Sequence, residues 1–215
     1  MSIIGISGSP IINGNADRIT KAVLEESGRD TKFINLCKIK FSPCRGCAHL
    51  CATTAMCGQK DELHPLIAEL RDAEALVFAS PRHHGDMTAW MYGFFSRLWC
   101  FLHDNHTLKN KPVVFVSTGI RDVAGDRGTF RASMVQEHEF NVLGEIYYNS
   151  LNFPCLTCKM GHYCKNPHAG LWGYLGKDED ALRNFEFTPD KFNRYEDDFD
   201  IVEQVKKYGK ILCEI

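Results

Sequence analysis

Short apolar runs alternate with amphipathic helical patterns along most of this chain of 215 residues. The runs are rich in Val, Ile, Leu and Phe, a composition typical of strands that are buried on both faces of a parallel sheet. We expect strands at residues 2–7, 31–36, 74–80, 111–119 and 144–151. The alternation predicts an α/β fold, a doubly wound five-stranded parallel sheet in a single domain spanning residues 1–215.

The helical segments carry apolar residues three or four positions apart. Leu63, Leu66, Ile67 and Leu70 form one such face. Gly28 follows the first helical pattern and is a natural helix stop. We expect helices near residues 15–28, 63–70, 87–102, 128–142 and 201–208.

Composition limits the class of protein. The net charge of −2 gives no electrostatic basis for binding nucleic acid or an anionic membrane. No segment approaches the roughly 20 apolar residues of a membrane span. The opening residues MSIIGISGSP lack the basic region and long apolar stretch of a signal peptide. We therefore expect a cytoplasmic protein, in which the ten cysteines serve metal binding or redox chemistry and not a disulfide framework.

Four of the cysteines crowd into the loop at residues 42–58, after the second expected strand. Their spacing is C-x2-C-x3-C-x5-C, which places two chelating pairs in one short segment. Such a loop can wrap an iron-sulfur cluster, which needs four thiolates on its corners. A structural zinc site with four cysteines is the main alternative. The predicted ligands are Cys44, Cys47, Cys51 and Cys57.

A second group lies in an irregular Cys- and His-rich insertion at residues 152–198. Cys155, Cys158 and Cys164 have the spacing C-x2-C-x5-C, and His162 and His168 are close in sequence. We expect a second metal centre here, either zinc or another iron-sulfur cluster, because a long aperiodic segment needs something to order it. The acidic and basic residues at 177–200 read as solvated surface. The remaining Cys37, Cys100 and Cys213 lie in or beside apolar runs and are expected to be small core residues.

Three loops with unusual chemistry follow expected strands, at residues 7–17, 80–87 and 117–128. The carboxyl ends of parallel strands meet at one edge of the sheet, where ligands bind in such folds. The first loop is rich in small and hydroxyl residues and opens a helix, so its backbone N–H groups can surround an anion. It contains neither a P-loop nor a dinucleotide fingerprint.

The segments GISGSP…GNAD, PC-x2-C, ALVFASPRHHG and KPVVFVSTG resemble the NADPH-dependent FMN reductase branch of the flavodoxin-like superfamily. Within that branch the chain resembles the iron-sulfur flavoproteins, which carry a compact cysteine motif after strand 2. The resemblance covers roughly residues 1–130. It implies a flavodoxin-like fold, bound FMN and a 4Fe-4S cluster on the compact motif. It also implies homodimers or homotetramers, and electron transfer with ferredoxin-like partners.

The resemblance assigns FMN contacts by position. Two departures from the family pattern concern the phosphate: Ile11 stands where a basic residue is common, and Ala16 where a hydroxyl is common. His83 and His84 replace the usual aromatic pair near the ring. The implied FMN-binding residues are Ser7, Ser9, Asn13, Asn15, Ala16, Pro81, Arg82, His83, His84, Gly85, Ser117, Thr118, Gly119 and Gly128.

Three hypotheses follow. The leading one is an FMN-dependent oxidoreductase or electron carrier that takes electrons from a ferredoxin-like donor to an unknown small-molecule acceptor, with the cysteine loop beside the flavin crevice. The second is an NAD(P)H-dependent flavin or quinone reductase with structural zinc at the cysteine sites. The third is a zinc-stabilised binding module that has lost FMN, which Ile11 and Ala16 would favour.

Overall fold

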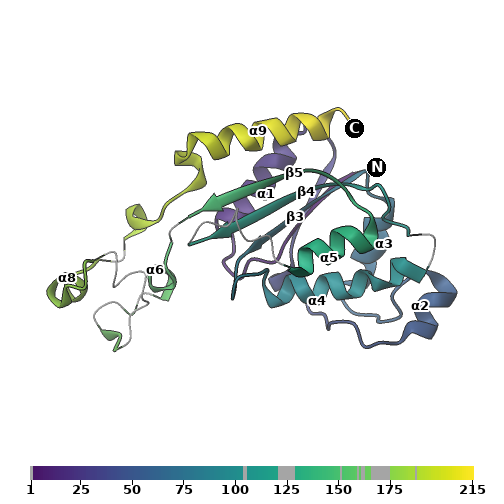
Figure 1. The fold of residues 1–215 in the computed structure, drawn as a ribbon, viewed down its shortest axis with the longest axis horizontal. Helices are drawn as coiled ribbons and strands as arrows, with labels where there is room; N and C mark the ends of the chain where they lie inside the picture. The colour runs from purple at the N-terminus through teal and green to yellow at the C-terminus, as the bar shows by residue number, and fades with distance from the viewer. Residues whose placement is uncertain are drawn as a thin grey trace.

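The computed structural model describes residues 2–103, 106–120, 129–150, 152–158, 160, 163–165, 175–186 and 188–215. In these residues, five strands form one sheet in the order β2-β1-β3-β4-β5 (Figure 1), and every neighbouring pair is parallel. The predicted doubly wound five-stranded sheet is therefore confirmed. The strands are β1 (Ile3–Ser7), β2 (Thr31–Asn35), β3 (Ala75–Pro81), β4 (Pro112–Gly119) and β5 (Asn141–Asn149).

Helices connect the strands and flank the sheet. The described α-helices are α1 (Asn15–Glu26), α2 (Ala48–Thr54), α3 (His64–Asp72), α4 (Ala89–Arg97), α5 (Thr129–His138), α6 (Pro154–Cys158), α8 (Glu179–Arg183) and α9 (Phe199–Cys213). Short 3₁₀ segments are η1 (Leu36–Lys38), η2 (Leu98–His103), η4 (Pro189–Lys191) and η5 (Tyr195–Asp197).

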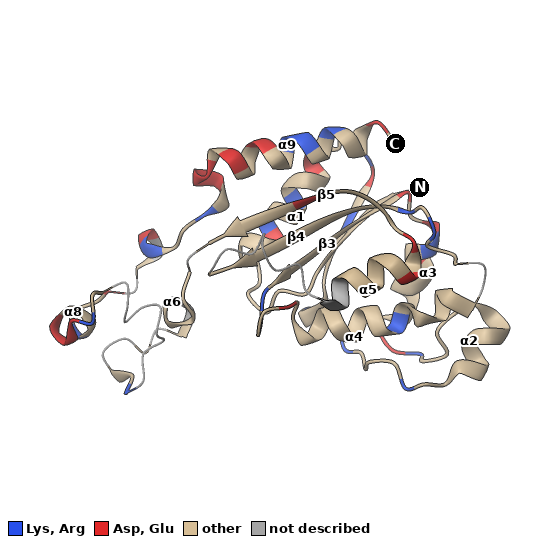
Figure 2. Cartoon of the chain, in the orientation of Figure 1, with Lys and Arg blue, Asp and Glu red and all other residues tan. Residues whose placement is uncertain are grey.

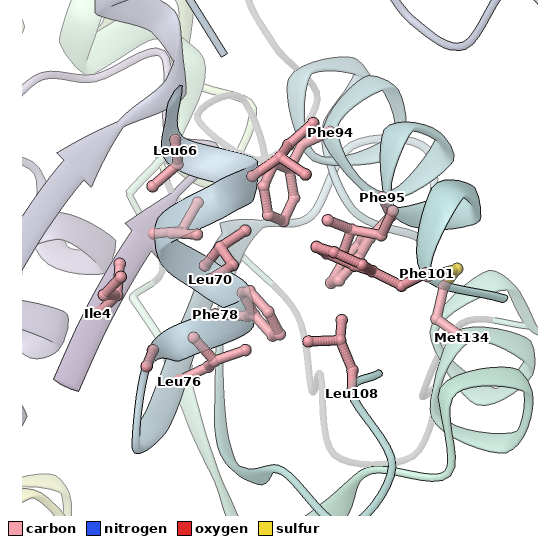
Figure 3. Close-up of a cluster of buried hydrophobic side chains, with 14 of the residues drawn as sticks. Ile4, Leu66, Leu70, Leu76, Phe78, Phe94, Phe95, Phe101, Leu108 and Met134 are labelled. Carbon is pink, nitrogen blue, oxygen red and sulfur yellow. The ribbon is translucent and has the colours of Figure 1, made fainter. Parts of the chain in front are cut away.

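The sheet separates two hydrophobic cores. In Figure 1, α1 and α9 lie on one side of the strands, and α3, α4 and α5 lie on the other. Figure 3 shows the core under α3 and α4, where Phe78 of β3 lies close to Phe94, Phe95 and Leu70. The ring centroids of Phe78 and Phe95 are 5.0 Å apart in an edge-on arrangement, a favourable geometry for buried aromatic pairs.

Local sequence explains where the elements form. All five residues of β1 are buried, as expected for a central parallel strand. Thr31 and Lys32 of β2 are exposed, and β2 lies at the edge of the sheet. The Thr88 side chain accepts a hydrogen bond from the Met91 N–H and begins α4. Asp198 caps α9 in the same way, through the Ile201 N–H.

The last helix packs directly on the first. Ile201, Val205 and Leu212 of α9 share the second core with the apolar face of α1. Their backbones approach closely, because a Cβ atom added to Gly209 would lie 2.3 Å from Glu26 Cβ. Gly144 of β5 leaves similar room for the Tyr208 ring, which would lie 1.9 Å from an added Cβ.

The elements predicted at residues 87–102 and 128–151 differ from those in the structure. The helix expected to continue to residue 142 ends at His138, and β5 begins at Asn141 instead of residue 144. The reason is Glu139, whose φ of 51° leaves the helical region so that Asn141 can pair with Pro112. The single helix expected at 87–102 is divided, since the chain tightens into η2 after Arg97.

The charged C-terminal stretch is mostly exposed, and Figure 2 shows acidic and basic residues mixed over α8 and α9. The prediction of a solvated surface is wrong at Tyr195, which is buried, whereas Glu196 is exposed and pairs with Arg18 of α1. Cys100 is buried as expected, whereas Cys37 is only half-buried and Cys213 is exposed at the end of α9. Among the described residues, no helix combines the length and hydrophobicity that crossing a membrane requires.

Candidate functional site

Three predicted loops leave adjacent strands at one edge of the sheet. Ser7 at the end of β1 is level with Ala79 of β3, and Ser80 is level with Ser117 of β4. Because the three strands are parallel, the loops that follow them start side by side. The structure therefore brings the first two loops together with the described start of the third.

The first loop is built around two buried hydroxyls. The Ser9 N–H donates to Ser7 Oγ at 3.2 Å, and Ser9 Oγ donates to the Ile11 carbonyl at 3.1 Å. The following helix, α1, begins at Gly14 without a side-chain cap. Its first-turn N–H groups are thus available to an anion, with the positive end of the helix dipole behind them.

The other predicted residues of this loop differ in what they offer. Asn13 adopts a left-handed conformation with a φ of 58°. The Asn15 side chain is already engaged: it donates to the Asn193 carbonyl at 3.0 Å and accepts from the Tyr195 N–H at 3.2 Å. Ala16 is buried in the first turn of α1. Because these hydrogen bonds occupy the Asn15 side chain, Asn15 would contact an anion through its backbone N–H.

Two cations beside this loop were missed by the sequence prediction. The Arg18 guanidinium donates to the Asn13 carbonyl at 2.9 Å and to Asn15 Oδ1 at 2.6 Å. Lys21 Nζ donates to Asn13 Oδ1 at 3.1 Å. These cations hold the loop from the side of α1, and they place positive charge near it although position 11 carries no basic residue. The signal available in the sequence was that both cations lie on the helix directly after this loop, within eight residues of Asn13.

A buried polar pair, also missed, holds the first loop to the end of β2. Asp17 is almost fully buried and accepts from the Asn13 N–H at 2.8 Å. Asn35 Nδ2 donates to both Asp17 oxygens, at 3.0 and 3.1 Å, and to the Ser9 carbonyl at 3.0 Å. Asn35 Oδ1 accepts from the Cys37 N–H at 2.9 Å. One side chain therefore joins the first loop to the segment that leads into the cysteine loop.

The second loop is a tight turn at residues 83–86. His83 and Asp86 exchange backbone hydrogen bonds of 2.7 and 3.1 Å, and His84 and Gly85 between them have positive φ angles. This is the geometry of a two-residue reverse turn with left-handed central residues. Arg82 lies just before the turn, and its guanidinium donates to the Gly85 carbonyl. Both histidine side chains are exposed.

Thr88 connects the second loop to the first. Its Oγ1 donates to the Gly8 carbonyl at 2.7 Å, and its N–H donates to Ser80 Oγ at 3.0 Å. Nearby, burial and a hydrogen bond to Asp86 raise the pKa of Tyr92 to about 12. Tyr92 therefore stays protonated at ordinary pH.

The third loop starts next to the second. The Arg82 N–H donates to the Thr118 carbonyl at 2.8 Å, beside Pro81 at the end of β3. The Gly119 carbonyl accepts from both the N–H and the hydroxyl of Ser150, at 2.7 and 3.0 Å. Ser117, one residue before Thr118, is half-buried. The predicted contact Gly128 lies outside the described residues.

The cysteine loop runs along α4. The Cys44 N–H donates to Ser96 Oγ at 3.0 Å, and Pro43 lies 3.5 Å from the position of a Cβ atom added to Gly93. The chain then forms α2, a helix that the sequence did not predict. Cys51 and Cys57 are buried in the hydrophobic core, whereas Cys44 is exposed and Cys47 is half-buried.

An apolar cavity of about 370 Å³ opens beside these cysteines. Its wall contains Cys44, Cys47 and Cys51, together with aromatic and aliphatic side chains of α4, η2 and α5. Burial is the main cause that raises the pKa of the Cys51 thiol, and electrostatic repulsion from Cys57, Cys47 and Cys44 raises this pKa further. The thiols of Cys44, Cys47 and Cys57 are thus near enough to Cys51 to affect its pKa. The cavity residues outside the cysteine loop are Phe95, Ser96, Trp99, Leu102, Ser133, Met134, Glu137 and His138.

Cys57 has a charged partner that the sequence prediction missed. The Arg97 side chain is fully buried, and its Nε donates to Cys57 Sγ at 2.9 Å. The same guanidinium pairs with Asp61 at 2.7 Å. Burial alone would raise the pKa of Asp61, but hydrogen bonds from Arg97 and the Ser42 N–H hold it below its usual range.

The cysteine loop and the first flavin loop contact opposite ends of α4, so the expected position of the cysteine loop beside the flavin stays a prediction. Thr88 contacts the first loop and Ser96 contacts Cys44, eight residues further along α4. At 1.5 Å per helical residue this separation is about 12 Å. In Figure 1, α2 lies near the ends where β3 and β4 begin, away from the ends where their loops leave.

The second cysteine group is less embedded. Cys155 in α6 is buried, Cys158 is exposed and Cys164 is half-buried. His162 and His168, the expected histidines, lie outside the described residues. Within the part of the chain that is described, no three His, Cys, Asp or Glu side chains converge closely enough to hold a single metal ion. Metal binding at either cysteine group therefore stays a prediction.

Residues 1–153 match the family described as NADPH-dependent FMN reductase. The chain belongs to this family. Among curated relatives, an iron-sulfur flavoprotein of Archaeoglobus fulgidus is 35% identical over 199 residues, covering 88% of this chain and 94% of the relative. An iron-sulfur flavoprotein of Methanocaldococcus jannaschii is 27% identical over 185 residues, covering 80% of this chain and 90% of the relative. The predicted resemblance to iron-sulfur flavoproteins of the FMN reductase family is confirmed.

Solved structures of similar fold include a flavone reductase, with a TM-score of 0.59 and 17% identity, covering 100% of this chain and 62% of that chain. A flavodoxin from the domain Archaea has a TM-score of 0.52 and 13% identity, covering 100% of this chain and 97% of that chain. The fold is flavodoxin-like, as predicted. As a member of the FMN reductase family, the protein is an FMN-dependent oxidoreductase. The family match speaks against the hypothesis of a binding module that has lost FMN, and the flavin analysis described below tests it.

Proposed function

We propose that this FMN reductase family member is an iron-sulfur flavoprotein that passes electrons between a ferredoxin-like donor, a 4Fe-4S cluster and FMN to a small-molecule acceptor. The observation that carries the proposal is the common cavity wall formed by Cys44, Cys47 and Cys51, with Cys57 held next to it by Arg97. The iron-sulfur flavoprotein relative that spans 88% of the chain supports it.

The residues at the sheet edge fit the phosphate and ring of FMN. The uncapped N-terminus of α1 and the buried hydroxyls of Ser7 and Ser9 would hold the phosphate. Pro81, Arg82, His83, His84 and Gly85 would lie against one side of the ring, and Ser117, Thr118 and Gly119 against another. When bound, FMN supplies the ability to hold one or two electrons. The protein's part is to orient the ring and to provide donors near it.

The cysteine loop fits a cluster by the chemistry of its donors. Three of the four thiols lie on an apolar cavity, and the fourth, Cys57, contributes to the raised pKa of the Cys51 thiol. Metal ligation stabilises thiolates in such a setting. A four-iron cluster takes one thiolate on each of its irons, so the four sulfurs need not converge on one ion. The cluster would supply one-electron transfer.

The test is anaerobic purification followed by analysis of the bound groups. We expect FMN in the supernatant of denatured protein, four irons and four sulfides per chain from this cluster, and a yellow-brown colour. Recovery of no flavin, or of FAD alone, would reject the flavin assignment. Zinc in place of iron and sulfide would reject the cluster.

The family description favours one alternative, an NAD(P)H-dependent flavin or quinone reductase with structural zinc at the cysteine sites. Rapid mixing of the oxidised protein with NADPH or NADH separates the two. Fast bleaching of the flavin, together with zinc in the metal analysis, would support the alternative. Slow bleaching by both nucleotides with fast reduction by reduced ferredoxin supports the leading proposal.

We also propose that Cys155, Cys158 and Cys164 bind a second metal centre, zinc or iron-sulfur. The buried position of Cys155 and the spacing of the three cysteines support it. Metal counting on a variant in which Cys44, Cys47, Cys51 and Cys57 are all serine decides the matter. Remaining iron identifies a second cluster, remaining zinc a structural site, and no remaining metal rejects the proposal.

The oligomeric state is a separate proposal. We expect homodimers or homotetramers, as the resemblance implies. Light scattering of the purified holoprotein measures this directly. A monomer at micromolar concentration would contradict it.

A further inference from the structure

Arg97 is a buried cation whose donors are all used within one loop. Its Nε–H donates to Cys57 Sγ at 2.9 Å. One terminal nitrogen donates to the Ser42 carbonyl at 2.8 Å and to Asp61 Oδ2 at 2.7 Å. The other donates to the Gln59 carbonyl at 3.2 Å and to Asp61 Oδ1 at 3.1 Å. All acceptors belong to residues 42–61, which comprise the cysteine loop at 42–58 and the three residues after it.

Burying the Arg97 charge costs free energy that its hydrogen bonds to this loop must offset. The Arg97 side chain has no exposed surface, and removing a charge from water is expensive unless partners satisfy it. Asp61 provides the opposite charge, and its side chain is 23% exposed. The guanidinium is planar and always charged, so its donors stay fixed in direction. It therefore presents a permanent positive charge and one N–H group to the sulfur of Cys57.

We propose that Arg97 is a positioning residue that sets the reduction potential of the iron-sulfur centre on Cys57, with Asp61 as an opposing charge. This inference rests on the proposed function, because it requires a cluster on the cysteine loop. Hydrogen bonds to cluster sulfurs and nearby charges are known determinants of cluster potentials. Arg97 lies on α4 and is not itself a ligand.

The direction of the effect follows from charge. Reduction adds one electron to the centre, so a nearby positive charge and an N–H···S bond stabilise the reduced form more than the oxidised form. Arg97 therefore raises the potential, and the Asp61 carboxylate lowers it. The two residues form one ion pair but act on the potential with opposite signs.

A purely structural role makes a different prediction. If Arg97 and Asp61 only hold the loop in shape, removing either partner breaks the same ion pair and loosens the same loop. Both variants would then disturb the centre in the same direction. The sign of the shift distinguishes the two roles, whatever the stability of each variant.

The experiment is a potentiometric titration of the anaerobically purified holoprotein, monitored by electron paramagnetic resonance. We expect a more negative potential in Arg97→Gln and a more positive potential in Asp61→Asn. Arg97→Lys keeps the charge and loses the paired geometry, so its shift should be smaller than that of Arg97→Gln. Arg71→Gln is the matched control, because Arg71 and Asp72 form an exposed pair away from the cysteines, and it should not shift.

A second readout uses the metal-free protein. Removing Arg97 takes away a positive charge and an N–H donor that favour negative charge on Cys57 Sγ. The rate of Cys57 labelling by a thiol reagent should therefore fall in Arg97→Gln and stay unchanged in Arg71→Gln, and a faster rate in Arg97→Gln would mean that Arg97 only holds the loop closed. Labelled Cys57 is quantified by peptide mass spectrometry. Equal labelling rates in the wild type and Arg97→Gln would overturn the contact itself.

The outcomes separate this inference from the proposed function. Wild-type protein that holds zinc and no iron would overturn both. Wild-type protein that holds the cluster, with shifts of the same sign or no shift in Arg97→Gln and Asp61→Asn, would overturn this inference alone. If Arg97→Gln fails to load iron, Arg97→Lys takes its place in the comparison. A negative shift in Arg97→Lys with a positive shift in Asp61→Asn supports the inference, and shifts of the same sign overturn it.

Discussion

The two cysteine groups of this protein begin with the same C-x2-C spacing but are embedded differently. The first group at residues 44–57 lies on a cavity, has two buried members and is held by the buried Arg97. The second group has one buried member, Cys155, and an exposed one, Cys158, on a short helix of five residues. The comparison shows that the spacing of cysteines identifies candidate metal ligands, whereas packing against the core determines how firmly those cysteines are held in place.

Replacing one cysteine in each group by serine tests this difference and should give the largest effect. Cys47→Ser should remove essentially all iron and sulfide of the first centre and leave FMN bound, because the cysteine loop lies about 12 Å along α4 from the first flavin loop. Cys158→Ser should leave that iron unchanged. Iron, sulfide and flavin analysis of both variants checks this. An unchanged iron content in Cys47→Ser would remove it from the ligands.

Acidification should weaken the support of the first group through a buried histidine. Burial, then the nearby His106, lowers the pKa of His138 to about 4 from 6.5, and His138 lines the cavity with Glu137. The folded state prefers the neutral ring, so its contribution to stability is complete above pH 6.5 and is lost as the pH falls toward 4. The loss is about 3 kcal/mol at most.

Urea unfolding of the metal-free protein between pH 7 and pH 4 measures this effect. His138→Phe is the informative variant, because Phe fills the same space beside Phe140 and cannot gain a proton. Its stability should fall less than that of the wild type over this range. Parallel pH curves for the two proteins would contradict the assignment to His138.

A glycine substitution should damage the flavin side and spare the cysteine side. A Cβ atom at Gly8 would lie 2.8 Å from Thr88 Oγ1 and 3.1 Å from Met91 Cβ, so Gly8→Ala must displace the contact between the first two loops. We expect a loss of about 1–3 kcal/mol in stability. The affinity for FMN should fall by about tenfold or more, equivalent to about 1.4 kcal/mol.

Gly93→Ala is the matched control for Gly8→Ala. A Cβ atom there would lie 3.4 Å from Phe41 and 3.5 Å from Pro43, which is ordinary contact. Because alanine favours a helix over glycine, Gly93→Ala should keep both cofactors and gain up to about 1 kcal/mol. Fluorescence titration with FMN and thermal melts measure both variants. If Gly93→Ala lost flavin and Gly8→Ala kept it, the prediction would be wrong.

A further prediction concerns Asn35, the residue that joins the two sides. Asn35→Ala removes the donor to Asp17 and the acceptor of the Cys37 N–H, and should cost about 1–3 kcal/mol because Asp17 is left buried with fewer partners. FMN affinity should fall, whereas iron content should not. Lys32→Ala, which breaks an exposed pair with Glu69, is the control and should change stability by less than about 1 kcal/mol.

The strands could be predicted from sequence because burial on both faces leaves a continuous apolar run, as in β1 and β3. The position of the three loops at one edge of the sheet could be predicted because the carboxyl ends of parallel strands lie together. The buried contacts could not be predicted, because Asn35 and Arg97 read as ordinary polar residues and acquire their roles only when distant segments meet. Arg97 and Cys57 are 40 positions apart, and no local pattern connects them. The boundary of β5 depended on a single left-handed residue, Glu139.

The packing of α9 on α1 has a consequence for synthesis on the ribosome. The apolar face of α1 that includes Ile19 and Val23 is completed by Ile201 and Val205 of a helix made much later. At ordinary elongation rates, α9 follows α1 by roughly 10 to 40 seconds. During that interval the nascent chain carries an uncovered apolar surface next to the loop expected to hold the FMN phosphate. Chaperones that recognise such surfaces have their best access to the chain at this stage.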